Sequence, residues 1–110
     1  MDQNVNYGEI LTRVLNEEAK IKIRLQPITF SAVCDAAIGQ FLLIATGWDN
    51  KRRVDAIIFH ARLVDDIVVV EDDNTEEGLS TALIEAGIPA ENIMTALSYA
   101  RQQRAELLAA

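Results

Sequence analysis

Aromatic residues are scarce in this chain and make up only 5% of its 110 residues. The core is therefore expected to be aliphatic, which a hydrophobic content of 50% allows. Cysteine occurs once, at Cys34, so no disulfide can form within the chain. Histidine also occurs once, at His60. One His and one Cys fall short of the four ligands of a structural zinc site, and no residue pattern implies a cofactor.

Positive charge is also scarce, because 10 Lys and Arg stand against 17 Asp and Glu and leave a net charge of −7. A DNA-binding surface needs clustered cations that displace counterions from phosphates. The only such cluster is Lys51-Arg52-Arg53, which is better explained as a solvated hairpin turn than as a phosphate contact. We therefore expect no direct binding to nucleic acid.

Long apolar runs and a recognisable signal peptide are lacking too, which predicts a cytoplasmic protein without a membrane contact. No repeat, low-complexity segment or linker divides the chain, so residues 1–110 are expected to form a single domain. A domain of this size buries roughly two-thirds of the surface that its unfolded chain exposes, which is enough for one core.

The first element is predicted to be a helix over Tyr7–Ala19. Its apolar side chains Ile10, Leu11, Val14 and Leu15 share one helix face. Asn4 or Asn6 is placed to cap its start, and Pro27 marks an extended connection after it.

Four strand-like runs follow, and they are joined by polar turns at Asp49-Asn50-Lys51-Arg52 and Val64-Asp65-Asp66. Such short connections force neighbouring strands to be antiparallel, which predicts a meander. The runs are Ile28–Cys34, Gln40–Thr46, Arg53–Leu63 and Ile67–Glu71.

The third run is apolar on both faces, if its side chains alternate strictly. Val54, Ala56, Ile58 and His60 would then share one face, and Ile57, Phe59, Ala61 and Leu63 the other. Helices can cover only one face of such a sheet fully, although a C-terminal helix could cover part of the second. The uncovered face predicts a partner, most simply a second copy in a homodimer.

A second helix is predicted from about Glu76 to Ala86, capped by Asn74 or Thr75 and ended by Gly87 and Pro89. Gly78 would lie in its first turn, where the usual reason for glycine is close approach of another backbone. The remaining chain is ambiguous between strand and helix. We expect a strand at Met94–Leu97 and a helix from about Tyr99.

The sequence therefore predicts an α+β fold, with an N-terminal helix, an antiparallel meander of four to five strands and C-terminal helices packed on one face. Within it, His60 is expected to be structural and hydrogen-bonded, and Trp48 to be a core or interface aromatic. The acids at 65–66 and 71–73 suit solubility and helix capping better than a Mg²⁺ or Ca²⁺ site, because they lack the spacing of a calcium loop.

Three motifs together resemble the family of the fdxN-element excision controlling factor XisI, small proteins of cyanobacteria and other bacteria. They are Gly47-Trp48-Asp49-x-x-x-Arg53-Val54, then Thr75-Glu76-x-Gly78, then Gly87-Ile88-Pro89, with His60 between the first two. Order and spacing match over most of the chain. The family's fourth-strand Lys and Trp are replaced by Ile67 and Val69, and an Arg expected shortly after Asp35 is absent. A His-Pro-Pro-like segment is replaced by Ser98-Tyr99-Ala100-Arg101.

The resemblance implies a non-enzymatic accessory protein that helps to control site-specific excision of a DNA element and is paired with a XisH-like, nuclease-related protein. If the replaced residues contact that partner, this chain serves a different one. The alternative is a ligand-binding protein or enzyme with a site around His60, Asp49, Arg53 and Glu76. A pocket that held these groups would favour the alternative, and a flat, symmetrical interface would favour the accessory role.

Overall fold

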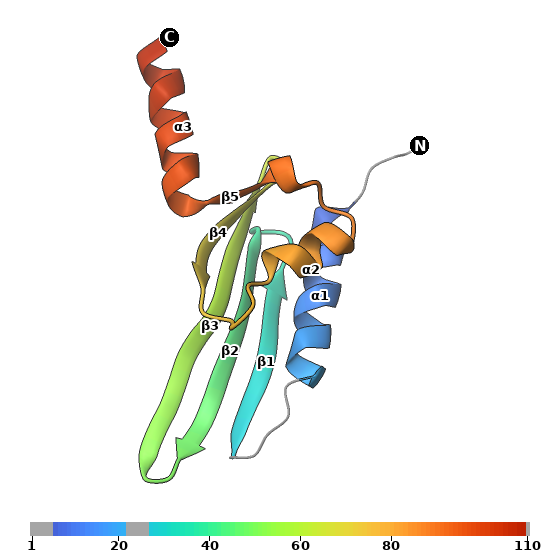
Figure 1. Ribbon diagram of the computed structural model, residues 1–110, viewed down its shortest axis with the longest axis vertical. Coiled ribbons are helices and arrows are strands. Elements are labelled where there is room, and N and C mark those ends of the chain that lie inside the picture. Colours follow the sequence, from blue (N-terminus) through green and yellow to red (C-terminus); the bar gives the residue numbers. More distant parts are fainter. Residues whose placement is uncertain (1–5, 22–26, 110) are drawn as a thin grey trace.

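A computed structural model describes residues 6–21 and 27–109 of the chain. It has the predicted α+β class, with an N-terminal helix, a five-stranded sheet and C-terminal helices (Figure 1). The expected cap at Asn4 lies outside the described residues. In chain order the elements are α1 Tyr7–Ile21, β1 Ile28–Asp35, β2 Gln40–Asp49, β3 Arg52–Val64, β4 Ile67–Asp73, α2 Ser80–Glu85, a 3₁₀ turn Ala90–Asn92, β5 Ile93–Thr95 and α3 Ala96–Ala109.

The sheet has the strand order β1-β2-β3-β4-β5, so every strand pairs with its neighbour in sequence. The first four strands are antiparallel, as their short connections predict. Asn50 in the β2–β3 turn and Asp65 and Asp66 in the β3–β4 turn adopt positive φ, a conformation that Asn and Asp tolerate. Strand β5 differs, because the chain crosses over through α2 and β5 therefore pairs with β4 in parallel.

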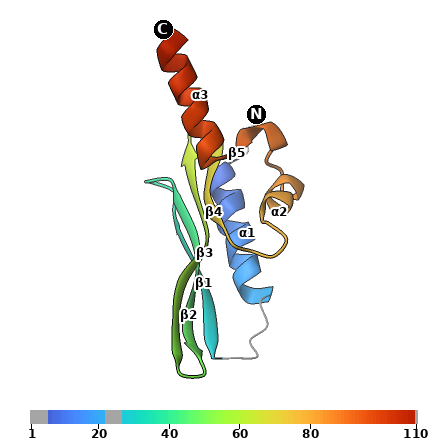
Figure 2. The ribbon, with the colours of Figure 1, turned by 60° about the vertical axis from the view of Figure 1, so that its left-hand side comes forward.

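Helices α1 and α2 cover one face of the sheet (Figure 2). The Asn6 side chain caps α1 by accepting a hydrogen bond from the Glu9 amide at 3.0 Å, which confirms one of the two predicted caps. Towards the C-terminal end of the chain, the side-chain amide of Asn92 donates a hydrogen bond to the Tyr7 hydroxyl at 2.8 Å. This contact ties the turn before β5 to the start of α1.

The core lies between these helices and the sheet. It is mostly aliphatic, as predicted, with α1 contributing Leu11 and Leu15. Two phenylalanines, Phe41 and Phe59, are nevertheless its largest fully buried side chains. The scarce aromatics are therefore concentrated where α1 meets the sheet.

Helix α3 leaves the end of the sheet and projects beyond it (Figures 1 and 2). It begins at Ala96 and not near Tyr99, because the Thr95 hydroxyl accepts a hydrogen bond from the Ser98 amide and caps the helix. Strand β5 is correspondingly short and stops at Thr95. Within the described ranges, no helix is long and apolar enough to cross a membrane.

Candidate interaction surface

The sheet face turned away from α1, here called the open face, carries three of the residues singled out from the sequence, which are Trp48, Arg53 and His60. Strand pairing and side-chain alternation place the same residue rows on it across β1, β2 and β3. Its members on these three strands include Thr29, Ser31, Val33, Asp35, Gln40, Leu42, Ile44, Thr46, Trp48, Arg53, Asp55, Ile57, His60 and Arg62.

A β-bulge gives β3 a pattern that strict alternation does not predict. Leu43 pairs with Phe59, but the next residue, Ile44, pairs with Ile57, so Ile58 is the extra residue. Phe59 is consequently buried in the core whereas Ile57 is 44% exposed. The bulge makes two predictions wrong: Ile57 does not share a face with Phe59, and His60 does not share one with Val54 and Ala56.

The centre of the open face is apolar and uncovered. Val33 is 49% exposed and pairs with Leu42, while Ile57 pairs with Ile44. Helix α3 lies at the β4–β5 edge of the sheet, where it contacts β4 and β5. Val69, which alternation places on the open face there, is fully buried. The C-terminal helix thus covers part of the open face, and β1–β3 remain exposed.

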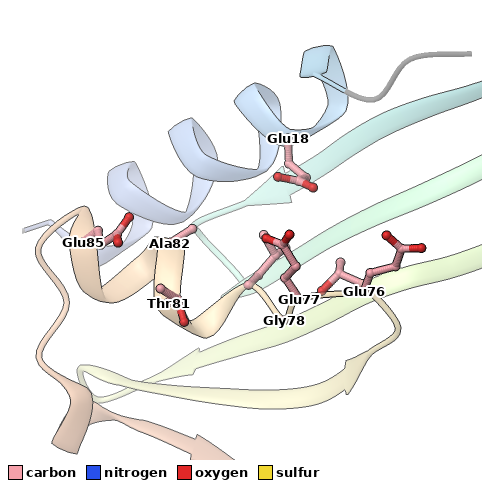
Figure 3. A pocket seen from close by; sticks show the side chains of 9 residues that line it. Glu18, Glu76, Glu77, Gly78, Thr81, Ala82 and Glu85 are labelled. Carbon is pink, nitrogen blue, oxygen red and sulfur yellow. The ribbon is translucent and has the colours of Figure 1, made fainter.

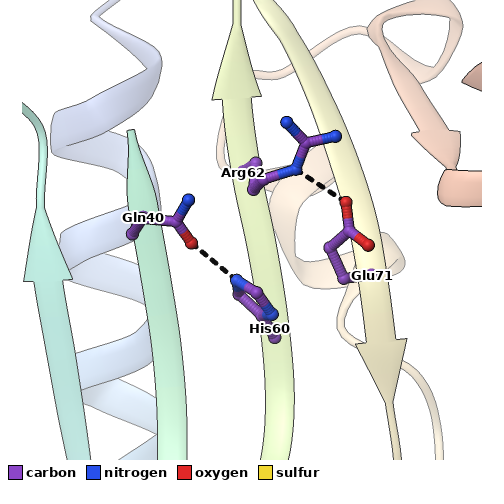
Figure 4. A network of polar contacts seen from close by, with 4 residues as sticks. All are labelled: Gln40, His60, Arg62 and Glu71. Carbon is purple, nitrogen blue, oxygen red and sulfur yellow. Dashed lines mark hydrogen bonds and ion pairs between the residues drawn. The ribbon is translucent and has the colours of Figure 1, made fainter. Parts of the chain in front are cut away.

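His60 lies beside this apolar centre and makes a hydrogen bond, as predicted for a structural histidine. Its Nε2 lies 2.7 Å from Gln40 Oε1 on the neighbouring strand (Figure 4). On the other side of β3, Arg62 Nε donates to Glu71 Oε2 at 2.7 Å. Both pairs lie on the face away from α1.

Trp48, Asp49 and Arg53 lie at the hairpin end of the sheet, where β2 turns into β3. The Arg53 guanidinium sits 5.5 Å from the centre of the Trp48 ring and also donates to the Gly47 carbonyl at 3.2 Å. Trp48 is 49% exposed. The expectation that it could be a core aromatic is wrong, because its side chain lies on the open face and points away from α1 and α2.

Thr75, Glu76 and Gly78 lie in a loop before α2. The predicted helix start at Glu76 is wrong, because α2 begins at Ser80. The Asp73 carboxylate organises the loop by accepting hydrogen bonds from the Thr75 amide and, 3.0 Å away, from the Leu79 amide. The backbone amide of Asn74 instead donates a hydrogen bond to the Ile58 carbonyl of β3. Since α2 begins only at Ser80, neither Asn74 nor Thr75 caps the helix.

Glycine is required in this region for backbone conformation. Gly78 has φ +79°, and a Cβ there would meet only the Asp73 carboxylate at 3.6 Å, so the predicted close backbone approach is wrong. Such an approach occurs at Gly47, where a Cβ would lie 2.0 Å from the Pro27 carbonyl oxygen. Gly87 ends α2 as predicted: its amide and that of Ile88 bond to the Ile84 and Leu83 carbonyls. Pro89 follows at the entry to the 3₁₀ turn.

The loop and α2 border a hollow of about 550 Å³ on the helix side of the sheet (Figure 3). Carboxylates dominate its polar lining, contributed by α1, the loop and α2. They are Glu18, Glu76, Glu77 and Glu85. Among the residues described, no three His, Cys, Asp or Glu side chains are grouped as metal ligands.

Cys34 and His60 lie on opposite faces of the sheet and form no nucleophilic pair. Cys34 packs against the core, whereas His60 bonds to Gln40 on the open face. Burial raises the pKa of the Cys34 thiol, and a hydrogen bond with Thr12 opposes this shift. A raised pKa lowers the thiolate fraction, so the residue suits packing better than nucleophilic attack.

The four residues of the alternative site do not converge either. His60 is seven residues from Arg53 on the same strand, roughly 20 Å at the rise of a β-strand. Asp49 lies with Arg53 at the hairpin end. Glu76 borders the hollow on the opposite side of the sheet.

Sequence reasoning missed Gln40 and Asp73. Gln40 becomes the partner of His60 only through strand pairing between residues 20 positions apart, for which the sequence holds no local signal. Asp73 did carry a signal, because an aspartate two residues before a threonine commonly accepts a hydrogen bond from that backbone amide.

Comparison with known proteins gives one family and a consistent fold. The family model described as XisI protein matches residues 1–109. A XisI-like protein from Anabaena variabilis ATCC 29413 superimposes with a TM-score of 0.74 at 20% identity, over 83% of this chain and 84% of that one. The fdxN element excision controlling factor XisI of the same organism gives 0.66 at 23% identity, over 82% and 88%. No curated protein matches the chain.

Proposed function

We propose that this chain, which belongs to the XisI family, is a non-enzymatic accessory protein that controls excision of a DNA element through protein partners. The family match over residues 1–109 is the observation that carries the proposal. A solved structure with the same fold is that of an fdxN element excision controlling factor, which supports the excision role. We expect the protein to act in the cytoplasm.

The exposed apolar residues and the negative net charge of the chain both support a function exerted through binding to other proteins. The open face offers Val33 and Ile57 as partly exposed apolar contacts, the kind of patch that mediates protein association. The net charge of −7 opposes direct contact with the phosphates of DNA. Because His60, Arg53 and Glu76 lie apart, we do not favour the enzyme alternative.

The partner that the family resemblance suggests is a XisH-like, nuclease-related protein. Regulation by an accessory subunit requires only that the two chains form a stable complex, and nothing in that mechanism requires this chain to perform chemistry. Replacement of the family's Lys by Ile67 changes a partly exposed position of β4, whereas Val69 is fully buried, so we expect a partner matched to this chain in particular.

The test joins a genetic and a biochemical measurement. Excision of the element is quantified by PCR across the rejoined DNA ends in the wild-type strain, in a strain that lacks this gene, and after complementation. The tagged chain is also co-expressed with the XisH-like protein of the same host. We expect excision to change upon deletion and the two chains to co-purify in a fixed ratio. Unchanged excision together with no co-purification would reject the role.

A further inference from the structure

In residues 6–21 and 27–109, no helix or strand covers the apolar centre of the open face. Helices α1 and α2 pack on the opposite face, and α3 packs mainly against β4 and β5. Val33 and Ile57 are 49% and 44% exposed in the middle of a three-strand surface. A sheet face of this kind is commonly covered by a second sheet, packed about 10 Å away with nearly aligned strands.

The two ends of this face differ in charge. At the hairpin end, Arg53 and Asp55 of the open face balance each other in charge, and Lys51 in the turn leaves one positive charge in excess. Asp49 and Arg52 are paired at the opposite parity and also balance. The opposite end carries three aspartates without a compensating excess of cations, because Arg62 and Glu71 neutralise each other. The three are Asp35, the last residue of β1, and Asp65 and Asp66 between β3 and β4.

This charge difference discriminates between the ways in which two copies can pack their open faces. A two-fold axis parallel to the strands would place the basic hairpins together and the acidic ends together, which is repulsive. A two-fold axis perpendicular to the strands places each basic hairpin against the acidic end of the other copy. Only this antiparallel arrangement is complementary in charge at both ends and apolar in the middle.

We infer that the open face is the interface of a two-fold symmetrical homodimer, with the two sheets face to face and antiparallel. Val33, Leu42, Ile44 and Ile57 of one copy pack against the same residues of the other near the axis. His60 and Gln40 share one hydrogen bond beside this patch, which pairs one polar atom of each side chain and lowers the cost of covering them. Trp48 and Arg53 meet the acidic end of the second copy, as residue types that dominate interface energies.

The first test uses two isoleucines of equal exposure on opposite sides of the molecule. Ile57 is 44% exposed on the open face, and Ile84 is 43% exposed on α2. Sedimentation velocity of the purified chain gives the dimer dissociation constant without any partner or DNA. Ile57→Lys should raise the dimer dissociation constant by about 30-fold or more, because both copies carry the change. Ile84→Lys should leave that constant within about twofold of the wild-type value.

Each other outcome decides against the inference. A wild-type chain that stays monomeric at about 100 μM would overturn it, since interfaces of standard size hold together well below that concentration. Loss of dimer with Ile84→Lys but not Ile57→Lys would move the interface to α2. A monomeric wild type whose complex with the XisH-like protein is lost in Ile57→Lys would assign the face to that partner. The proposed excision role would survive all three results.

The second test addresses the antiparallel orientation. One variant carries Lys51→Glu and Arg53→Glu, which makes both ends of the face acidic, and the other carries Asp35→Lys and Asp66→Lys, which makes both basic. Each alone should be monomeric, and a mixture of the two should form a heterodimer. Dimerisation of each variant alone as strongly as wild type would refute the orientation. The wild-type chain provides a check that does not depend on whether the variants fold. Its dimer dissociation constant should rise roughly tenfold between 50 and 500 mM salt, because salt screens the charged ends.

Discussion

Trp48 keeps half of its surface in solvent and holds Arg53 against its ring at the hairpin end of the sheet. An aromatic in this position contributes less to folding than one in the core. Trp48→Ala should therefore lower the free energy of unfolding by about 1–2 kcal/mol, whereas Phe41→Ala, which empties a fully buried site, should lower it by about 3–5 kcal/mol. Urea unfolding at low protein concentration measures both, and an equal loss would show that Trp48 is buried in the isolated chain.

Substitution of Gly47 and Gly78 by Ala compares the cost of a steric clash with the cost of backbone strain. A Cβ at Gly47 would lie 2.0 Å from the Pro27 carbonyl oxygen, so Gly47→Ala must displace β1 from β2 and should cost at least about 3 kcal/mol. Gly78→Ala adds only the strain of a positive φ and should cost about 1–2 kcal/mol. Thermal unfolding ranks the two, and a larger loss at Gly78 would contradict the described loop geometry.

Residue types alone anticipated some of these roles but not the burial of their side chains. One hydrogen-bonded histidine in an apolar strand was predictable, because an unpaired polar ring there is costly. Its partner Gln40 depends on strand register, and the exposure of Trp48 depends on which face of the sheet the helices cover. Both are properties of the assembled sheet.

At the scale of elements, the loop between β4 and α2 depends on one carboxylate. Asp73 accepts hydrogen bonds from the Thr75 and Leu79 amides, while its neighbour Asp72 accepts only from the Asn74 side chain. Asp73→Ala leaves those part-buried amides unpaired and should cost about 1–3 kcal/mol.

Asp72→Ala is the matched control, since it removes the same charge one position away and should change stability by within about 0.5 kcal/mol. Chemical unfolding followed by circular dichroism compares the two variants. Equal stability of both would mean that Asp73 does not anchor the start of α2.

Local patterns predicted the strongly periodic elements well. The apolar stripe of α1, the polar turns at Asn50 and Asp65-Asp66 and the glycine after α2 are signals carried within a few residues. The errors occurred where a tertiary contact decides. The bulge at Ile58 moved Ile57 to the open face, and the Thr95 cap brought residues expected to be strand into α3.

At the scale of the whole molecule, charge sets the expected relation to DNA. With a net charge of −7 and cations clustered only at the hairpin, the chain should show no appreciable affinity for duplex DNA at physiological salt. Fluorescence anisotropy with a labelled duplex measures this. Micromolar binding that disappears when Lys51, Arg52 and Arg53 are all replaced by Ala would make the hairpin a DNA contact.

The sequence anticipated the class of the fold and an apolar sheet surface that the helices do not fully cover, because both follow from composition and alternation. It did not locate that surface, since Val33, Ile44 and Ile57 come together only through the pairing of β1, β2 and β3. The opposite charges of the two sheet ends likewise emerge only when Asp35 and the 65–66 turn are brought to one end.

The central claim is that protein covers the open face, and the mass of the purified wild-type chain in solution tests it most directly. Sedimentation equilibrium over a range of micromolar concentrations should give a mass that rises to twice the 12.2 kDa of one chain. It should fall back towards one chain on dilution and at high salt. A mass of 12.2 kDa at every concentration would contradict the claim of self-association.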